Sequence, residues 1–115
     1  MAKIQYGLRE LQFIADDGHG WLEVPTADVE ASGYKPSKYS YHEQRLGKDW
    51  TYLEEDADIS GFMVATGVDP ADVVDVINHV SNYIRLTGSC WVNTLDHCSG
   101  EGFVSRFPMM FREAN

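Results

Sequence analysis

The chain has 115 residues, of which 43% are hydrophobic, and its formal net charge at pH 7 is −9, from 18 acidic and 9 basic side chains. This length predicts a single domain over residues 1–115, which buries about two-thirds of the surface that its unfolded chain exposes. The negative charge argues against direct binding to nucleic acid or to anionic lipid, because proteins that bind either normally carry a basic surface. No apolar run is long enough to span a bilayer, so we expect no membrane segment.

The two cysteines, Cys90 and Cys98, flank a predicted turn. The N-terminal residues lack the apolar stretch of a secretory leader, so reduced thiols are expected rather than a disulfide. We therefore predict a cytoplasmic protein. Its size and apolar content are sufficient for a core, so we expect it to fold without a metal or cofactor.

In the first half of the chain, residues 11–15 and 21–24 predict two strands joined by a tight turn. The turn is Asp16-Asp17-Gly18-His19-Gly20, whose glycines supply the positive backbone angles that such turns need. A helix is expected from Thr26, as its cap, to about residue 32, with Gly33 ending it. Residues 38–43 and 50–55 predict a second hairpin, closed by residues 45–49 and stabilised by cross-strand aromatic pairs.

In the second half, a helix is expected to begin at Asp56 or Asp58 and to end at Gly67. The clearest helix start is Asp69-Pro70, with Asp69 as the N-cap. Its buried stripe is predicted to be Val73, Val76, Ile77, Val80 and Ile84. Residues 90–95 and 102–107 predict a last hairpin. These elements indicate an α+β fold, in which a small antiparallel sheet built from hairpins is covered on one face by two to three helices.

Two clusters of potential metal ligands occur, and neither matches a known motif. Asp16, Asp17 and His19 lie close enough to suggest a metal- or histidine-dependent site, but turn chemistry explains the same residues. Cys90, His97 and Cys98 are soft ligands, but they lack the closely spaced cysteine pair of zinc sites. No nucleotide-binding or hydrolase motif is present. The sequence therefore predicts no catalytic residue and no metal site.

The charge is concentrated in one segment, because no Lys or Arg occurs between Asp49 and Ile84. Negative side chains at helix N-termini are stabilising, which accounts for part of this segment. The rest predicts a one-signed surface that attracts a basic partner, although a solvated face without a partner is the alternative. The predicted partner-binding residues are Glu54, Glu55, Asp56, Asp58, Asp69, Asp72 and Asp75.

Three stretches resemble a family of small proteins from bacteriophages, plasmids and bacterial genomes. They are DGHGWLEVP at 17–25, KYSY at 38–41 and YLEEDAD at 52–58, and the resemblance covers roughly residues 12–64. The family pattern is D-x-GHGWL-x-V, S-x-YSY and YLEED-x-D in that order. This chain departs from it in a longer loop at 42–49, and its C-terminal half is not covered. The resemblance implies a mobile-element setting in a bacterial host and implies no activity.

Three hypotheses follow. The first is a non-enzymatic interaction protein whose acidic surface occupies a basic groove on a host protein, as an anti-CRISPR or antirestriction inhibitor that mimics nucleic-acid charge. The second is a small enzyme that uses Asp16, Asp17 and His19. The third is an accessory homodimer, pairing through a sheet edge or through Trp50 and Tyr52.

Overall fold

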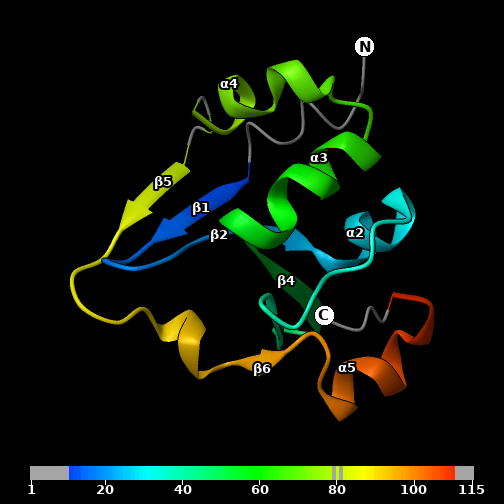
Figure 1. Cartoon of the computed structure of the whole chain (residues 1–115). Coiled ribbons are helices and arrows are strands. Elements are labelled where there is room, and N and C mark those ends of the chain that lie inside the picture. Colours follow the sequence, from blue (N-terminus) through cyan, green and yellow to red (C-terminus); the bar gives the residue numbers. More distant parts are fainter. Residues whose placement is uncertain (1–10, 79, 81, 111–115) are drawn as a thin grey trace.

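The computed structural model describes residues 11–78, 80 and 82–110, and its centre is a six-stranded mixed sheet in the order β5-β1-β2-β4-β3-β6 (Figure 1). The strands are β1 (Gln12–Ala15), β2 (Gly20–Pro25), β3 (Tyr41–Arg45), β4 (Lys48–Glu54), β5 (Asn82–Arg85) and β6 (Asp96–His97). The longer helices are α2 (Thr26–Ser32), α3 (Ser60–Ala65), α4 (Val73–Asn78) and α5 (Glu101–Arg106). Short helical turns are η1 (Glu55–Ile59), η2 (Pro70–Asp72), η3 (Trp91–Thr94) and η4 (Pro108–Met110). The α+β fold is confirmed.

The predicted first hairpin is present, with β1 and β2 antiparallel and Ile14 opposite Trp21. The second hairpin, β3–β4, is also present, and its loop is tighter than expected, because Leu46 and Gly47 both adopt positive φ. Strand β4 pairs with β2 on its other side, so the two hairpins form one continuous sheet.

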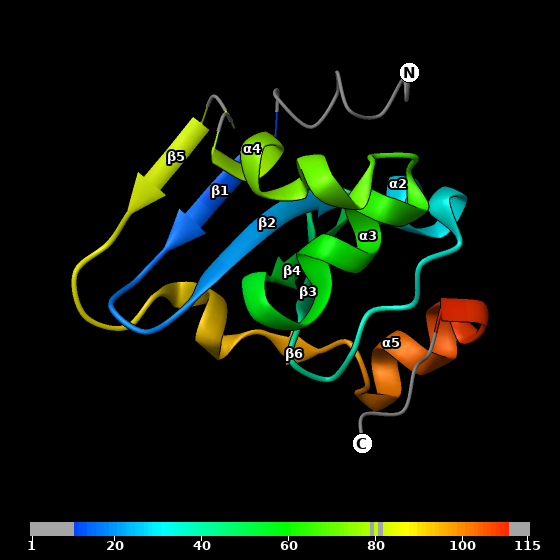
Figure 2. The same ribbon diagram turned by 45° about the horizontal axis from the view of Figure 1, so that its top comes forward.

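Side chains alternate between the two faces of this sheet, as the period of a strand requires. One face carries Phe13, Leu22, Val24 and Leu53, which pack against apolar residues of α2, η1, α3 and α4. Figures 1 and 2 show α3 and α4 over this face, which confirms the predicted helical layer. The opposite face carries a second cluster, and it is covered by η3 rather than by a long helix. That cluster consists of Ile14, Trp21, Tyr52, Cys90 and Val92.

Two of the predicted helix ends are confirmed, and one predicted N-cap is wrong. Gly33 ends α2 with φ 80°, and its N–H bonds to the carbonyl of Glu30. Asp69 caps η2 by accepting a hydrogen bond from Ala71 N, with Pro70 in the first turn. Thr26 is not a cap, because its hydroxyl bonds to that of Thr51 at 2.8 Å inside the sheet.

The second half of the chain differs from the prediction at two places. The helix that begins after Asp69 ends at Asn78 instead of reaching Ile84, which lies in β5 and pairs parallel to Ile14. The sheet is therefore mixed rather than antiparallel. The predicted last hairpin is wrong, because residues 91–94 form η3, β6 pairs with β3, and residues 101–106 form α5. Strands β5 and β6 form by pairing with β1 and β3, which are distant in sequence, so local patterns do not predict them.

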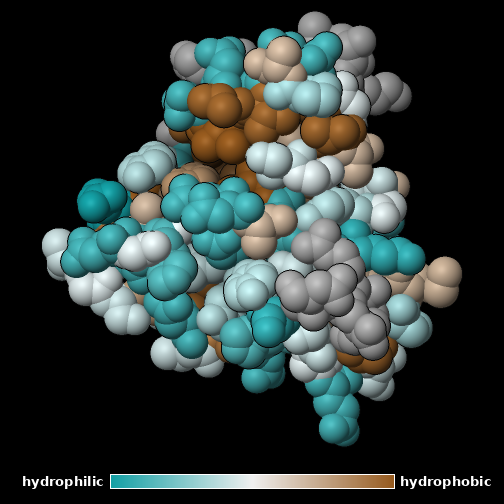
Figure 3. All heavy atoms as spheres, viewed as in Figure 1, coloured by the Kyte–Doolittle hydropathy of each residue, from teal (hydrophilic) through white to brown (hydrophobic). Residues whose placement is uncertain are grey.

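Two surface features bear on partner binding. Tyr52 is fully buried, so its predicted role as an exposed contact in a homodimer is wrong. Figure 3 shows hydrophobic residues gathered over α3 and α4, and Val64 and Val74 on these helices are exposed. None of the described helices is long and apolar enough to cross a membrane.

Candidate functional site

The register of the sheet places four chemically versatile side chains on one face. Trp21 of β2 lies directly opposite Glu54 of β4, and Tyr41 of β3 lies directly opposite His97 of β6. Tyr41 is also opposite Tyr52, which is two residues from Glu54, so all of them share the face that η3 covers. Because strand pairing sets these positions, residues that are far apart in sequence converge there.

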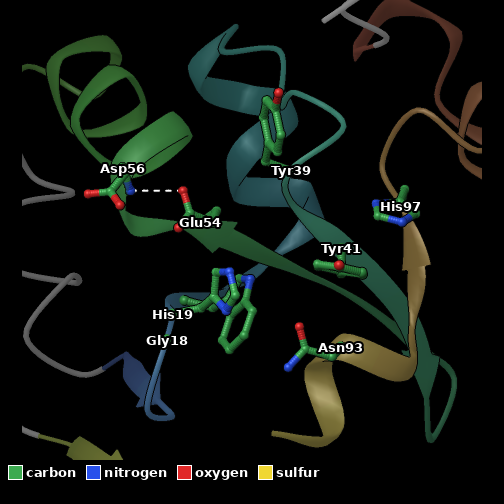
Figure 4. A pocket seen from close by; sticks show the side chains of 9 residues that line it. Gly18, His19, Tyr39, Tyr41, Glu54, Asp56, Asn93 and His97 are labelled. Carbon is green, nitrogen blue, oxygen red and sulfur yellow. Dashed lines mark hydrogen bonds between the residues drawn. The ribbon is translucent and has the colours of Figure 1, made fainter. Parts of the chain in front are cut away.

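A pocket of about 320 Å³ opens at this point. Figure 4 shows its side chains arriving from several separate segments of the chain, with His19, Tyr41 and Asn93 around a common space. The lining residues are Gly18, His19, Trp21, Tyr39, Tyr41, Glu54, Asp56, Asn93 and His97. We call this the central pocket.

Aromatic and imidazole rings form a continuous row along the pocket. His19 stacks on Trp21 with centroids 5.5 Å apart, and Trp21 meets Tyr41 edge to face at 6.2 Å. Tyr41 in turn contacts the ring of His97 at 4.6 Å. Nδ1 of His97 lies 2.7 Å from the carbonyl oxygen of Lys38, which fixes the ring. The row is a rigid wall, because each ring is packed against the next.

Asp16 holds the loop that carries His19. Its Oδ1 accepts hydrogen bonds from Gly18 N and His19 N, and its Oδ2 accepts from Cys90 N and from Asn93 Nδ2, all at 2.8–3.0 Å. Burial alone would raise the pKa of Asp16, but these four donors outweigh it and lower the pKa to about 2. Both oxygens are used, so Asp16 is a structural anchor for the pocket rather than a metal ligand or a base.

Asp58 holds the segment that carries Tyr39 and Tyr41. It is fully buried and accepts hydrogen bonds from Tyr34 Oη, from Ser37 N and Oγ, and from Ser40 Oγ. Its prediction as a partner-binding residue is wrong, because a carboxylate with no exposed surface cannot contact a partner. Ser40 Oγ also accepts from Glu54 N at 2.9 Å, which ties this network to the pocket wall.

Glu54 is only 8% exposed, so it belongs to the pocket wall. It does not lie on an open surface, where the sequence placed it. Its Oε1 caps η1 by accepting from Asp56 N and Ala57 N, the first of which is drawn in Figure 4. Burial raises the pKa of Glu54, and the neighbouring charges of Asp56 and Glu55 raise it further. Burial and Asp56 also raise the pKa of Glu55, against a lowering by His19. Glu54 and Asp56 are the two carboxylates that line the pocket.

The other predicted partner-binding residues are exposed and divide into two groups. Asp56 lines the central pocket, and its neighbour Glu55 lines a second pocket of about 310 Å³ beside α4 and β5. Asp69, Asp72 and Asp75 lie on η2 and α4. The structure thus assembles part of the predicted acidic surface around the pocket and places the rest on a different element.

Four lining residues, Trp21, Tyr39, Tyr41 and Asn93, were not predicted as site residues, and His97 was grouped with the two cysteines. Tyr39 was placed in a strand, whereas it precedes β3 and is 51% exposed. Asn93 and His97 reach the pocket because η3 and β6 fold back across the sheet. The pairing of Tyr41 with His97 has no local signature that would have shown this.

The cysteines do not form a metal site with their neighbours. Cys90 and Cys98 are free and buried, and burial raises the pKa of both thiols. Among residues 11–78, 80 and 82–110 no group of three or more His, Cys, Asp and Glu side chains is arranged to hold a metal ion. The described part of the chain therefore offers a binding pocket and no metal centre.

Comparison with known proteins finds no matching family model, no similar curated protein and no similar solved structure. The function is therefore inferred from the chemistry of the described residues alone.

Proposed function

We propose that this chain is a non-enzymatic interaction protein that binds a basic protein partner through its exposed carboxylates. The proposal is supported by exposed carboxylates that have no cationic partner among the described residues. Among the described residues, no Lys or Arg forms an ion pair with Glu55, Asp56, Asp69 or Asp72. Exposed charges of one sign raise the rate of association with an oppositely charged surface and orient it.

In its most concrete form, the partner is a nucleic-acid-handling complex of a bacterial host. Exposed carboxylates on a rigid scaffold can occupy a groove that otherwise binds phosphates, as an anti-CRISPR or antirestriction inhibitor would. The mobile-element setting implied by the family resemblance agrees with this form of the proposal. The mixed sheet and its two buried clusters supply the rigidity, because they hold Glu55 and Asp56 directly after β4.

A pull-down from bacterial lysate with two matched variants tests the proposal. The first variant replaces three exposed acids of the proposed surface, Glu55→Gln, Asp56→Asn and Asp72→Asn. The second removes the same number of charges from exposed acids elsewhere, Asp28→Asn, Glu30→Gln and Glu101→Gln. We expect the wild type and the second variant to retain the same nucleic-acid-binding protein at low salt and to release it at high salt.

The first variant should retain about tenfold less of that protein. Equal loss in both variants would show that total charge matters and that the proposed surface does not. Unchanged retention by the first variant would contradict the proposal outright.

A further inference from the structure

The central pocket combines aromatic rings with carboxylates, and Lys38 Nζ lies over the outer ring, that of Tyr39, 5.4 Å from its centroid. Trp21, Tyr39 and Tyr41 supply three electron-rich rings, and Glu54 and Asp56 supply two carboxylates. In the described part of the chain, neither carboxylate forms an ion pair with Lys or Arg. Aromatic faces and carboxylates both attract cations, so the lining is complementary to a positive group.

The same molecule shows what such a set of groups binds. On another part of the sheet, the guanidinium of Arg45 lies over the ring of Trp50, 4.9 Å from its centroid. Its Nη1 is 3.3 Å from Glu23 and 3.4 Å from Glu43. One ring and two carboxylates therefore hold an arginine inside this protein. The central pocket repeats that combination, and the described residues place no arginine in it.

The shape of the lining favours a guanidinium over an ammonium. A guanidinium is planar, so it stacks on flat rings, and its five N–H donors need several acceptors around one plane. Tyr39, which is 51% exposed, and the half-buried Tyr41 present such rings to the pocket, whereas Trp21 is buried and meets Tyr41 edge to face. Acceptor oxygens are available on Glu54 and Asp56, and the side-chain amide of Asn93 adds another.

We propose that the central pocket receives the guanidinium of an arginine side chain presented by the basic partner. This inference rests on the proposed function, and it names the anchor of that interaction. Such an anchor is typical of protein interfaces, in which one buried aromatic or arginine contact contributes most of the affinity. The repulsion among Glu54, Glu55 and Asp56 is relieved when a cation enters, which adds to the stacking energy.

The test is an NMR titration of the ¹⁵N-labelled protein with N-acetyl-arginine methylamide, which presents the side chain as a peptide does. We expect saturable shifts of the indole N–H of Trp21, of the side-chain amide of Asn93 and of the backbone N–H of His19. The neutral citrulline analogue should shift them at least about fivefold less at equal concentration. The lysine analogue should bind more weakly, because it lacks the planar stacking surface.

Three controls sharpen this test. Asp56→Asn should weaken binding of the arginine probe about fivefold, the upper range for one partly exposed charge, whereas Asp28→Asn on α2 should leave it unchanged. Glu54→Gln, which keeps an acceptor oxygen for the cap of η1, should weaken it as well. Free arginine should bind about as tightly as the probe, because its ammonium and carboxylate charges cancel and leave the same net charge.

The outcomes separate this inference from the proposed function. Equal shifts with the citrulline or lysine analogue, or equal binding by Asp56→Asn and Asp28→Asn, would overturn the arginine pocket. Tighter binding of free arginine would indicate a small-molecule site and would also overturn it. If the probe binds as expected while the pull-down retains no partner, the pocket stands and the proposed function fails. If the pull-down succeeds and the probe does not bind, only the pocket assignment fails.

Discussion

Asp16 is the residue on which the geometry of the central pocket most depends. Replacement by Asn turns one acceptor oxygen into a donor, which then faces either Cys90 N and Asn93 or the N–H groups of Gly18 and His19. We expect Asp16→Asn to lower the free energy of unfolding by about 2–3 kcal/mol, since a buried donor loses its partner. Urea denaturation measures this.

The neighbouring Asp17 is the matched control for that variant. Its side chain is 68% exposed and makes a 3.2 Å contact with Gly88 N and a 3.8 Å contact with Arg85. Asp17→Asn should change stability by no more than about 0.5 kcal/mol. Equal losses in the two variants would show that Asp16 does not have the anchoring role described above.

His42 predicts a pH dependence of stability. Its ring packs on Phe103 at 4.8 Å, its Nε2 is buried with no hydrogen-bond partner among the described residues, and burial lowers its pKa below 6.5. As the pH falls below about 6.5 the unfolded state takes up a proton before the folded state does, so stability decreases until the lowered folded pKa is reached. Above about pH 6.5, where His42 is neutral in both states, its contribution to stability is constant.

His42→Phe should remove this dependence, because a phenyl ring fills the same space and does not titrate. Urea midpoints at pH 7.5 and pH 5.5 should therefore differ less in the variant than in the wild type. The same difference in both proteins would mean that another group is responsible for the acid sensitivity.

At the scale of elements, the segment 34–40 depends on Asp58 and on its close approach to α3. A Cβ at Gly61 would collide with the ring of Tyr34, whose hydroxyl bonds to Asp58 at 2.6 Å. Asp58→Asn should therefore loosen this segment more than it lowers overall stability. The expected result is faster hydrogen exchange at Ser37 N by at least about tenfold, with Asp56→Asn as the control.

Exchange at Ser37 N that is as slow in Asp58→Asn as in Asp56→Asn would contradict this assignment. Tyr39 lies in this segment and Tyr41 follows it directly, so the same measurement reports whether the two tyrosines of the pocket are positioned by the buried carboxylate.

Elements with local signals were predicted from the sequence, and elements that depend on distant pairing were not. The end of α2 at Gly33 and the Asp69 cap follow from the chemistry of neighbouring residues. The turn at 16–20 was predicted, but its predicted positive φ at glycine is wrong, because Asp16 Oδ1 holds the turn by accepting from Gly18 N and His19 N. The apolar spacing that includes Ile84 fits a helix and a strand equally well, and β5 forms because Ile84 pairs with Ile14. The same reason explains β6, which forms where it meets β3.

The candidate site divides in the same way. Glu54 and Asp56 were predicted from the acidic segment, and both line the central pocket. Asp58 lies in the same run but is buried, because four donors from residues 34–40 surround it. The sequence does not show these contacts. The sequence also did not show that Trp21, Tyr41, Asn93 and His97 meet, because strand register brings them together.

At the scale of the whole molecule, two properties combine. The charge is concentrated in residues 49–84, which contain no Lys or Arg, and two carboxylates of this segment, those of Glu54 and Asp56, line the central pocket. Long-range charge accelerates the encounter with a basic partner, and a buried anchor slows dissociation. A protein with both properties is suited to compete with nucleic acid for a basic groove.

The most direct measurement is therefore displacement of a fluorescently labelled DNA oligonucleotide from the captured partner, followed by anisotropy. The account predicts that the wild type and the Asp28→Asn, Glu30→Gln, Glu101→Gln variant displace the oligonucleotide at equal concentrations, and less effectively as salt rises. The Glu55→Gln, Asp56→Asn, Asp72→Asn variant should need about tenfold more protein. Binding to the partner without displacement of DNA, or equal displacement by both variants, would contradict the account.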